Sequence, residues 1–279
     1  MTGKILVLGA NGNIGRPLVR TLMELGEEVK AASRSGNGID GAEGVVFDIT
    51  NPATFSRALE GIDRAFVMLP TGYLEAKLLL GPLIEALAAR KVKVVFLSVF
   101  GVEADDSIPY RQVELAVEQS GTPFVILRPN WFADNFLTFW KAGVDHGQIA
   151  VPAADGKTSF IDVRDVAQSA AAVLTTDHFD GHAFNLTGPE ALSYAQAASL
   201  LSDLLGKPVT YNALDDAAFV TILTGAGMPQ DYAHFLASIF YPVRQGWTAS
   251  VTDAVEKLTG NKPRSLKTCL QDNLSSLTA

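Results

Sequence analysis

Three glycines near the amino end have the spacing of a loop that holds a diphosphate. Gly9, Gly12 and Gly15 follow an apolar run over residues 4–9 and lead into a helical pattern that starts at Ile14. In that context the first glycine permits a tight turn, the second lets the backbone approach a pyrophosphate, and the third allows close helix–strand packing. The N–H groups and positive dipole end of the helix then face the anion. We expect dinucleotide binding by Gly9, Asn11, Gly12, Asn13, Ile14 and Gly15; the alternative is a glycine turn that binds nothing.

The end of the next predicted strand indicates which dinucleotide would be bound. NAD-selective sites carry an acidic residue there, which accepts the ribose 2′-hydroxyl. This chain has Ser33-Arg34-Ser35 instead. A guanidinium between two hydroxyls suits a 2′-phosphate through charge-assisted hydrogen bonds. The sequence therefore favours NADP(H) over NAD, with Ser33 and Arg34 as ligands, against the alternative of a solvated surface arginine.

Further cofactor contacts are predicted where the following strands end, because ligands of open α/β sheets bind at the carboxyl ends of the strands. Asp48 ends the third strand, where it could either bind the adenine or cap the next helix, and the sequence does not separate these two roles. The fourth and fifth strands end in segments that should border the nicotinamide, namely Met68, Leu69 and Pro70, and Ser98, Val99 and Phe100.

The elements that position these residues follow from the hydrophobic pattern. Short β-branched runs alternate with helical periods through the first 130 residues, which is typical of a parallel sheet covered on both faces. We expect a Rossmann-like, doubly wound α/β fold. Its strands should cover residues 4–9, 28–33, 44–48, 64–69, 93–98 and 123–128, with the clearest helices at 14–25 and 110–119, and a kinked or restarted helix around Gly81-Pro82 within 74–90.

The character of the chain changes after residue 130. We expect residues 1–130 to form the NADP-binding domain and 131–279 a smaller, mostly helical substrate-binding lobe, partly interwoven with the first. Short strands are predicted at 159–163 and 182–186, and helices at 166–174 and 193–205. The second of these helices has a capping serine, Ser193, and a terminating glycine, Gly206.

Composition excludes several classes of protein. With 48% hydrophobic and 19% charged residues the chain is neither disordered nor fibrous. A net charge of −8 disfavours nucleic acid and anionic lipid as partners. The single Cys269 and the absence of a long apolar stretch or cleavable leader predict a cytoplasmic protein without a membrane helix. A small-molecule substrate is the expected partner, and a homodimer is left open.

Together these residues resemble the atypical short-chain dehydrogenase/reductases of the NmrA-like group. The resemblance covers most of the chain and is most specific in the stretch SGTPFVILRPNWFADNF at 120–136. It also includes the glycine motif, Arg34, FLS at 96–98 and FIDVRDVA at 160–167. The resemblance implies an NAD(P)-binding protein similar to NADPH-dependent quinone and dye reductases, to enzymes that reduce iminium or enone intermediates, or to redox-sensing regulators.

The chain departs from the wider superfamily at a catalytic motif. Typical members carry Tyr-x-x-x-Lys after the fifth strand, where the tyrosine protonates an alkoxide and the lysine lowers its pKa. Here Tyr110 is followed one helical turn later by Glu114, a carboxylate in place of the ammonium. A Tyr-x-x-x-Lys does occur at Tyr73 and Lys77, but it follows the fourth strand, and we interpret it as coincidence.

This departure limits the chemistry. Reduction of an ordinary ketone produces a basic alkoxide and needs a proton donor, whereas quinones, enones and iminium ions can accept hydride by positioning alone. We therefore predict an NADPH-dependent reductase of a planar or conjugated electrophile. Tyr110, Ser98 and Asn130 are the candidate catalytic residues. Planar substrates suit aromatic walls, for which we single out Trp131, Phe132, Phe136, Tyr232 and Phe235, although for each of these aromatics taken singly a place in the core is the stronger expectation.

Other functions stay open at this point. A redox-sensing regulator that binds the dinucleotide without turnover would show the same motifs, as would a non-redox isomerase or cyclase that needs the cofactor only structurally. The four histidines show no metal-binding spacing, so no metal site is expected. No Gly-x-Ser-x-Gly precedes a helix, which disfavours a hydrolase triad at Ser98.

Overall fold

The computed structural model describes residues 3–278, which form two compact units. Of the described residues, unit 1 holds 3–129, 163–186 and 254–261, and unit 2 holds 130–162, 187–253 and 262–278. Unit 1 thus includes two segments that lie beyond residue 130 in the sequence.

Unit 1 is built on a seven-stranded sheet in which every neighbouring pair is parallel. This confirms the predicted doubly wound sheet and adds a seventh strand, because the short strand predicted at 182–186 pairs with the preceding edge strand. The order across the sheet is β3 (Glu43–Val46), β2 (Val29–Ser33), β1 (Lys4–Leu8), β4 (Ile62–Met68), β5 (Lys93–Leu97), β6 (Phe124–Pro129) and β9 (His182–Leu186).

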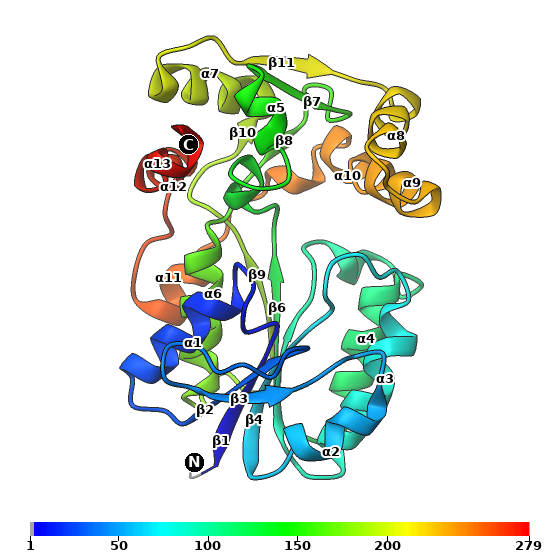
Figure 1. Cartoon of the computed structure of the whole chain (residues 1–279), viewed down its shortest axis with the longest axis vertical. Coiled ribbons are helices and arrows are strands. Elements are labelled where there is room, and N and C mark those ends of the chain that lie inside the picture. The colour runs from blue at the N-terminus through cyan, green and yellow to red at the C-terminus, as the bar shows by residue number, and fades with distance from the viewer. Residues whose placement is uncertain (1–2, 279) are drawn as a thin grey trace. The chain divides into compact units, whose positions relative to one another are not determined.

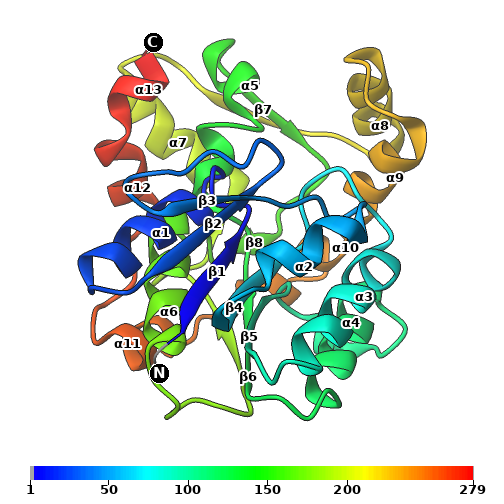
Figure 2. The same cartoon turned by 60° about the horizontal axis from the view of Figure 1, so that its bottom comes forward.

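Helices cover both faces of this sheet (Figures 1 and 2). On one face α1 (Gly15–Glu24) packs against α6 (Val163–Leu174), which in turn contacts α11 (Ala254–Thr259). The other face carries α2 (Phe55–Ala58), α3 (Ala76–Ala88) and α4 (Pro109–Glu118), with short turns η1 (Pro52–Thr54) and η2 (Val102–Ala104). The second face buries a cluster in which α3 and α4 meet the sheet, including Leu80, Leu83, Val113, Val117 and Phe96.

Unit 2 is mostly helical and has an aromatic core. It contains two small sheets, one pairing β7 (Gln148–Val151) with β11 (Thr210–Ala213) and one pairing β8 (Lys157–Thr158) with β10 (Leu192–Ser193). Phe136, Phe160, Tyr194 and Phe240 are buried and in mutual ring contact. Its elements are η3 (Ala133–Phe136), α5 (Lys141–Asp145), β7 (Gln148–Val151), β8 (Lys157–Thr158), β10 (Leu192–Ser193), α7 (Tyr194–Leu205), β11 (Thr210–Ala213), α8 (Asp216–Gly225), α9 (Gln230–Ser238), α10 (Tyr241–Arg244), η4 (Trp247–Ala249), α12 (Leu266–Asp272) and α13 (Leu274–Thr278).

One local prediction was wrong. The strand expected at 159–163 is reduced to an isolated parallel bridge between Phe132 and Ile161: β8 ends at Thr158, Ser159 N donates to Thr248 O, and α6 already begins at Val163. Of the kink or restart expected at Gly81-Pro82, the restart does not occur, because α3 runs through both residues. The carbonyl that loses its partner at Pro82 belongs to Leu78, whose side chain lies on the exposed face, where water can satisfy the carbonyl.

Helix α7 begins and ends as predicted. The Ser193 hydroxyl accepts from Gln196 N, the Gln196 side chain accepts from Ser193 N, and Gly206 ends the helix with φ +63°.

Across residues 3–278, the helices include none with the length and apolar character needed to cross a bilayer.

Candidate functional site

The β1–α1 turn has the form that a diphosphate-binding loop requires. Gly9 has φ +64°, a left-handed conformation that favours glycine. A Cβ on Gly15 would lie 2.1 Å from Gly9 O, so a side chain there cannot fit without moving backbone. Gly12 N donates to Gly9 O at 2.8 Å and closes the turn directly before α1. The turn thus leads into the amino end of a ten-residue helix, whose first backbone N–H groups have no partner within the helix and can face an anion.

Arg34 and Asp48 lie beyond the ends of β2 and β3, close enough for their charges to interact. Arg34 is exposed, and its positive charge is one of the influences that hold the pKa of Asp48 below its ordinary value. The larger influences are hydrogen bonds from Thr50, whose hydroxyl and backbone N–H both donate to Asp48 Oδ1, at 2.7 and 2.9 Å. The Asp48 carboxylate therefore shapes the loop after β3, while Asn51 caps η1. An adenine contact by Asp48 stays a prediction.

The end of β4 packs against the glycine turn, and the end of β5 lies one strand further along the sheet. Met68 Sδ would lie 3.0 Å from a Cβ on Gly9, so this side chain packs against the turn, and Leu69 behind it is buried. Beyond β5, Ser98 N and Phe100 N donate to Leu127 O and Pro129 O of β6, which fixes the segment. Pro70 and Val99 are exposed at this edge.

Ser98 presents a buried hydroxyl at the same edge. The side chain is 3% exposed, and its oxygen makes no hydrogen bond of normal geometry to any of residues 3–278. The hydroxyl nevertheless lies close enough to Glu114 to help lower the pKa of that carboxyl. A buried hydroxyl without a partner is uncommon in a folded protein and fits a polar group of a bound molecule. With the glycine turn, it is the second feature here that fits a dinucleotide.

Helix α4 carries Tyr110 and, one turn later, a buried ion pair. The Tyr110 ring stacks on Phe96 of β5 with centroids 6.3 Å apart. Glu114 is 0% exposed and accepts from Arg128 Nε at 2.8 Å, from Arg128 Nη2 at 2.7 Å and from Arg111 Nη1 at 2.9 Å. Burial alone would raise the pKa of Glu114, but these guanidinium bonds and the Ser98 hydroxyl outweigh it, so the pKa is lowered.

The Glu114–Arg128 pair was not predicted from the sequence. A signal for it exists, since Arg128 is a charged residue within the apolar run of β6 and Glu114 lies between the buried Val113 and Val117 of α4. A buried charge in each of two packed elements implies a pair. In the other tyrosine motif, Tyr73 lies before α3 begins and does not share a helix with Lys77.

Asn130 is the first residue of unit 2, and its side chain is engaged in the fold. It is buried, and its amide nitrogen donates to Ser159 Oγ and Thr248 O, each at 2.8 Å. Its amide oxygen accepts from Trp131 N at 2.9 Å. The amide thereby holds η4 and the segment after β8 in place within unit 2.

The predicted aromatic contacts all lie in unit 2 and differ in exposure. Phe136 is fully buried in the aromatic core, which leaves it no surface for a ligand. Trp131 and Phe132 are half-buried, and Trp131 packs against Phe240 with centroids 4.6 Å apart. Tyr232 and Phe235 form a partly exposed pair on α9, with Phe235 38% exposed. Of the five, Tyr232 and Phe235 offer the most accessible pair of rings.

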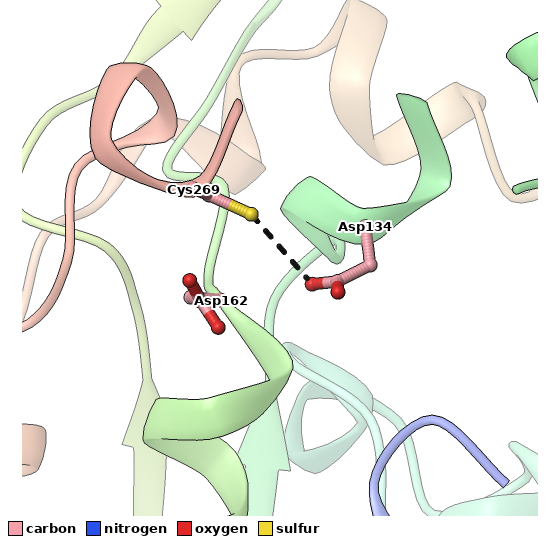
Figure 3. A group of neighbouring side chains, drawn as sticks. All are labelled: Asp134, Asp162 and Cys269. Carbon is pink, nitrogen blue, oxygen red and sulfur yellow. Dashed lines mark hydrogen bonds between the residues drawn. The ribbon is translucent and has the colours of Figure 1, made fainter. Parts of the chain in front are cut away.

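Unit 2 also brings together Asp134, Asp162 and Cys269, a grouping the sequence did not predict. Figure 3 shows Cys269 Sγ, from α12, directed at Asp134 Oδ2, 4.0 Å away, with Asp162 beside them. One ligand atom from each residue lies within 4.8 Å of the others, close enough to hold a metal ion. A thiol and two carboxylates combine soft and hard donors, so the grouping by itself does not point to a particular metal.

Comparison with known proteins finds relatives that are similar over nearly the whole chain. The chain is 31% identical to an NAD(P)H azoreductase of Xenophilus azovorans, over 93% of this chain and 94% of that protein. It is likewise 31% identical to an uncharacterized oxidoreductase of Bacillus subtilis strain 168, over 94% and 92%. The crystal structure of an NADPH-dependent quinone oxidoreductase from Escherichia coli superimposes with a TM-score of 0.80 at 25% identity, covering 99% of this chain and all of that one.

A model of the NmrA-like family matches residues 1–268, which include the glycine turn, the Ser98 edge and the Glu114–Arg128 pair. The match confirms the resemblance inferred from the motifs. The chain belongs to the NmrA-like family.

Proposed function

We propose that this protein is an NADPH-dependent oxidoreductase that reduces a planar, conjugated electrophile such as a quinone, an enone or an iminium ion. The single observation that carries the proposal is the β1–α1 turn, which packs so closely on the start of α1 that backbone occupies the position of any Gly15 side chain. When bound, the reduced dinucleotide supplies the hydride. The residues of the chain bind and orient it.

The dinucleotide would lie along the carboxyl ends of the strands of unit 1. Backbone N–H groups around Asn11 and Asn13 would face the diphosphate, and Ser98 would meet the nicotinamide end. The identities of the relatives support this placement, since the azoreductase is named for NAD(P)H and the quinone oxidoreductase for NADPH.

Arg34 supports the choice of NADP(H). Its guanidinium is exposed beyond β2, where a 2′-phosphate would lie, and Ser33 Oγ beside it accepts from Gly36 N at 3.1 Å, which orders the loop. Asp48 would keep the exposed guanidinium near this edge by its negative charge.

The class of electrophile follows from the groups present on α4. The position of the superfamily lysine holds Glu114, and this anion is already paired with Arg128. A carboxylate in place of an ammonium one helical turn after Tyr110 favours substrates whose reduced form is a weak base. The names of the two relatives refer to azo compounds and quinones. Tyr110 is proposed as proton donor or orienting group, and Tyr232 and Phe235 as contacts for a flat substrate.

Two measurements on the purified protein test this proposal. Fluorescence titration should show NADPH binding at least tenfold tighter than NADH binding. NADPH oxidation should then be followed with a panel of quinones, enones and iminium salts, with a simple ketone as the negative control. Binding without turnover on any member would favour the redox-sensing regulator, and no binding of either dinucleotide would remove both functions.

A further inference from the structure

We propose that Tyr241 and Trp247 of unit 2 form a stacking platform for the flat ring of the electrophile. This inference deepens the proposed function, on which it rests, and it concerns unit 2 alone. Tyr241 is the first residue of α10 and Trp247 is the first residue of η4. Neither is among the aromatics singled out from the sequence as substrate contacts.

The two rings are unusually exposed and are oriented by each other. Among residues 3–278, Trp247 and Tyr241 are the most exposed tryptophan, tyrosine or phenylalanine side chains, at 59% and 50%, against 38% for Phe235. Their centroids lie 5.7 Å apart with the planes at 85°, an edge-to-face contact. In that geometry, the ring that contributes its edge keeps both of its faces uncovered by its partner. A flat conjugated molecule can stack on such a face.

The backbone that carries Trp247 is fixed by buried hydrogen bonds. The next residue, Thr248, is 5% exposed. Its hydroxyl donates to Lys157 O at 2.8 Å, and its carbonyl accepts from Asn130 Nδ2 at 2.8 Å and from Ser159 N at 3.1 Å. An exposed indole therefore stands on a turn whose own polar groups are all engaged beneath it.

The segment is held on the Tyr241 side as well. Phe240, directly before it, is 2% exposed and belongs to the aromatic core of unit 2. At the end of α10, Arg244 donates to Pro152 O at 2.6 Å and to both carboxylate oxygens of Asp216, at 2.9 and 3.1 Å. Both exposed rings thus belong to an ordered segment, so a ligand that stacks on them does not have to order the backbone first.

The size of the exposed apolar surface favours a small molecule over a protein as the occupant. An aromatic side chain carries about 150–250 Å², so two half-exposed rings present roughly 200 Å². A stable protein interface buries about 800 Å² on each partner. Gln245 and Ser250, on either side of Trp247 in the chain, are exposed and polar, as is Lys157 below the turn. The platform therefore matches one flat ring system rather than a second copy of the chain.

The first test observes the platform directly, because the chain has only three tryptophans. In ¹⁵N-labelled protein, the indole N–H signals of Trp131, Trp140 and Trp247 can be assigned with single Trp→Phe variants. Titration with 1,4-naphthoquinone without NADPH, so that no reduction occurs, should shift the Trp247 signal most and the buried Trp140 signal least. A shift confined to Trp131, or no shift, overturns the proposal. A Trp247 signal that moves with protein concentration alone identifies a second copy as the occupant and also overturns it.

Three substitutions of Trp247 separate ring stacking from general apolar contact. Trp247→Phe keeps a flat ring and should hold the dissociation constant for 1,4-naphthoquinone, measured by calorimetry, within about threefold. Trp247→Leu and Trp247→Ala should raise it about tenfold, since leucine keeps apolar bulk but no ring. Phe139→Ala is the control, because it removes another exposed ring of unit 2, 48% exposed in the turn before α5. Full affinity in the leucine variant contradicts a stacking site.

Steady-state kinetics separate this inference from the proposed function. At saturating NADPH, Trp247→Ala should raise the KM for 1,4-naphthoquinone about tenfold and leave kcat within about twofold. Its NADPH affinity and melting temperature should equal those of wild type. If wild type binds the quinone at Trp247 and never reduces it, the proposed function fails and the platform stands. If the quinone is reduced but neither its KM nor the Trp247 signal responds, the platform fails and the proposed function stands.

Discussion

The two ends of the parallel sheet in unit 1 both bury charge, but they use it differently. At the amino end, Lys93 of β5 is 4% exposed and pairs with Asp180 at 2.5 Å, and its ammonium also donates to Thr176 O. Arg64 of β4 pairs with Glu27 and Asp63 and donates to Gly3 O. These cations join strand ends to loops, and their partners are all supplied by the chain.

The carboxyl end instead buries an anion, Glu114, and keeps polar groups available. The Ser98 hydroxyl is buried without a hydrogen bond of normal geometry to residues 3–278, and the Gly9–Gly15 turn packs closely on the amino end of α1. The difference teaches that buried charge alone does not mark a site. What marks it is charge beside polar groups that the protein itself leaves unsatisfied.

The largest expected effect is at the glycine turn. Gly15→Ala places a Cβ 2.1 Å from Gly9 O, so the turn must open. We expect NADPH affinity to fall by two orders of magnitude or more and stability to fall by about 1–3 kcal/mol. Gly81→Ala is the control, because its Cβ meets no atom within 4 Å and an alanine within α3 should be neutral or stabilising. Unchanged titration curves for Gly15→Ala would refute the assigned binding turn.

Tyr110→Phe tests the carboxyl end of the sheet through the residue proposed to face the substrate. The ring can keep its stacking on Phe96, so the melting temperature should be unchanged. Loss of a positioned proton donor should lower kcat by about 10²-fold. Steady-state kinetics on the best electrophile measure this, and full retention of turnover would end the donor role.

Arg34→Ala should act on one coenzyme only. A charge-assisted hydrogen bond to phosphate contributes about 1.5–3 kcal/mol, so the KM for NADPH should rise about 10- to 100-fold. The KM for NADH should change little. Arg20→Ala, which removes another exposed arginine, paired with Asp40, is the control. Equal small effects of Arg34→Ala on both coenzymes would reject Arg34 as the 2′-phosphate ligand.

For Lys93, at the amino end of the sheet, we expect a loss of stability without a loss of activity. Lys93→Met leaves Asp180 and the Thr176 carbonyl without their buried cation, which should cost about 1–3 kcal/mol of unfolding free energy. The kinetic constants of the folded variant should match wild type. Urea unfolding and steady-state kinetics on the same preparation check both parts. A large loss of kcat at full folding would remove the contrast between the two ends.

The smallest expected effect is a dependence of protein stability on pH. The pKa of Glu114 is lowered below 4.5 in the folded protein, so its ionisation stabilises the fold above that pH. The groups that face it, Arg111 and Arg128, stay charged throughout, and Glu103 lies on the far side of Arg128. The stability difference between wild type and Glu114→Gln should be constant near neutral pH. It should shrink as the pH falls below 4.5 and the carboxyl of the folded protein takes up a proton. A difference independent of pH would contradict the pairing.

The sequence predicted those parts of the fold that depend on local pattern. The strands follow from apolar runs that alternate with helical periods, and the Gly9–Gly15 turn follows from the spacing of its glycines. The Ser193 cap follows from the residues at the start of one helix. The sequence could not place residues 182–186 as the seventh strand, because parallel pairing with β6 depends on a partner more than 50 residues away. The grouping of Asp134 with Cys269 is hidden for the same reason.

The candidate site shows the same division. Arg34 and Ser98 could be named because strand ends meet at one edge of a parallel sheet. Their surroundings could not, since the pairing of Glu114 with Arg128 depends on the packing of α4 against β6, and the burial of Phe136 depends on the core of unit 2. The Tyr-x-x-x-Lys departure was visible in the sequence, but the counter-ion of the substituting carboxylate was not.

The way β9 enters the sheet bears on how the chain can be synthesised and divided. β9 covers the edge of β6 from Val125 to Pro129, and α6, from the same later segment, packs on α1. A ribosome that has released only the first 129 residues would therefore present an unpaired strand edge and an uncovered helix face. A gene fragment cut at that boundary should yield aggregated product, whereas one that extends through Asn261 carries all the segments unit 1 needs.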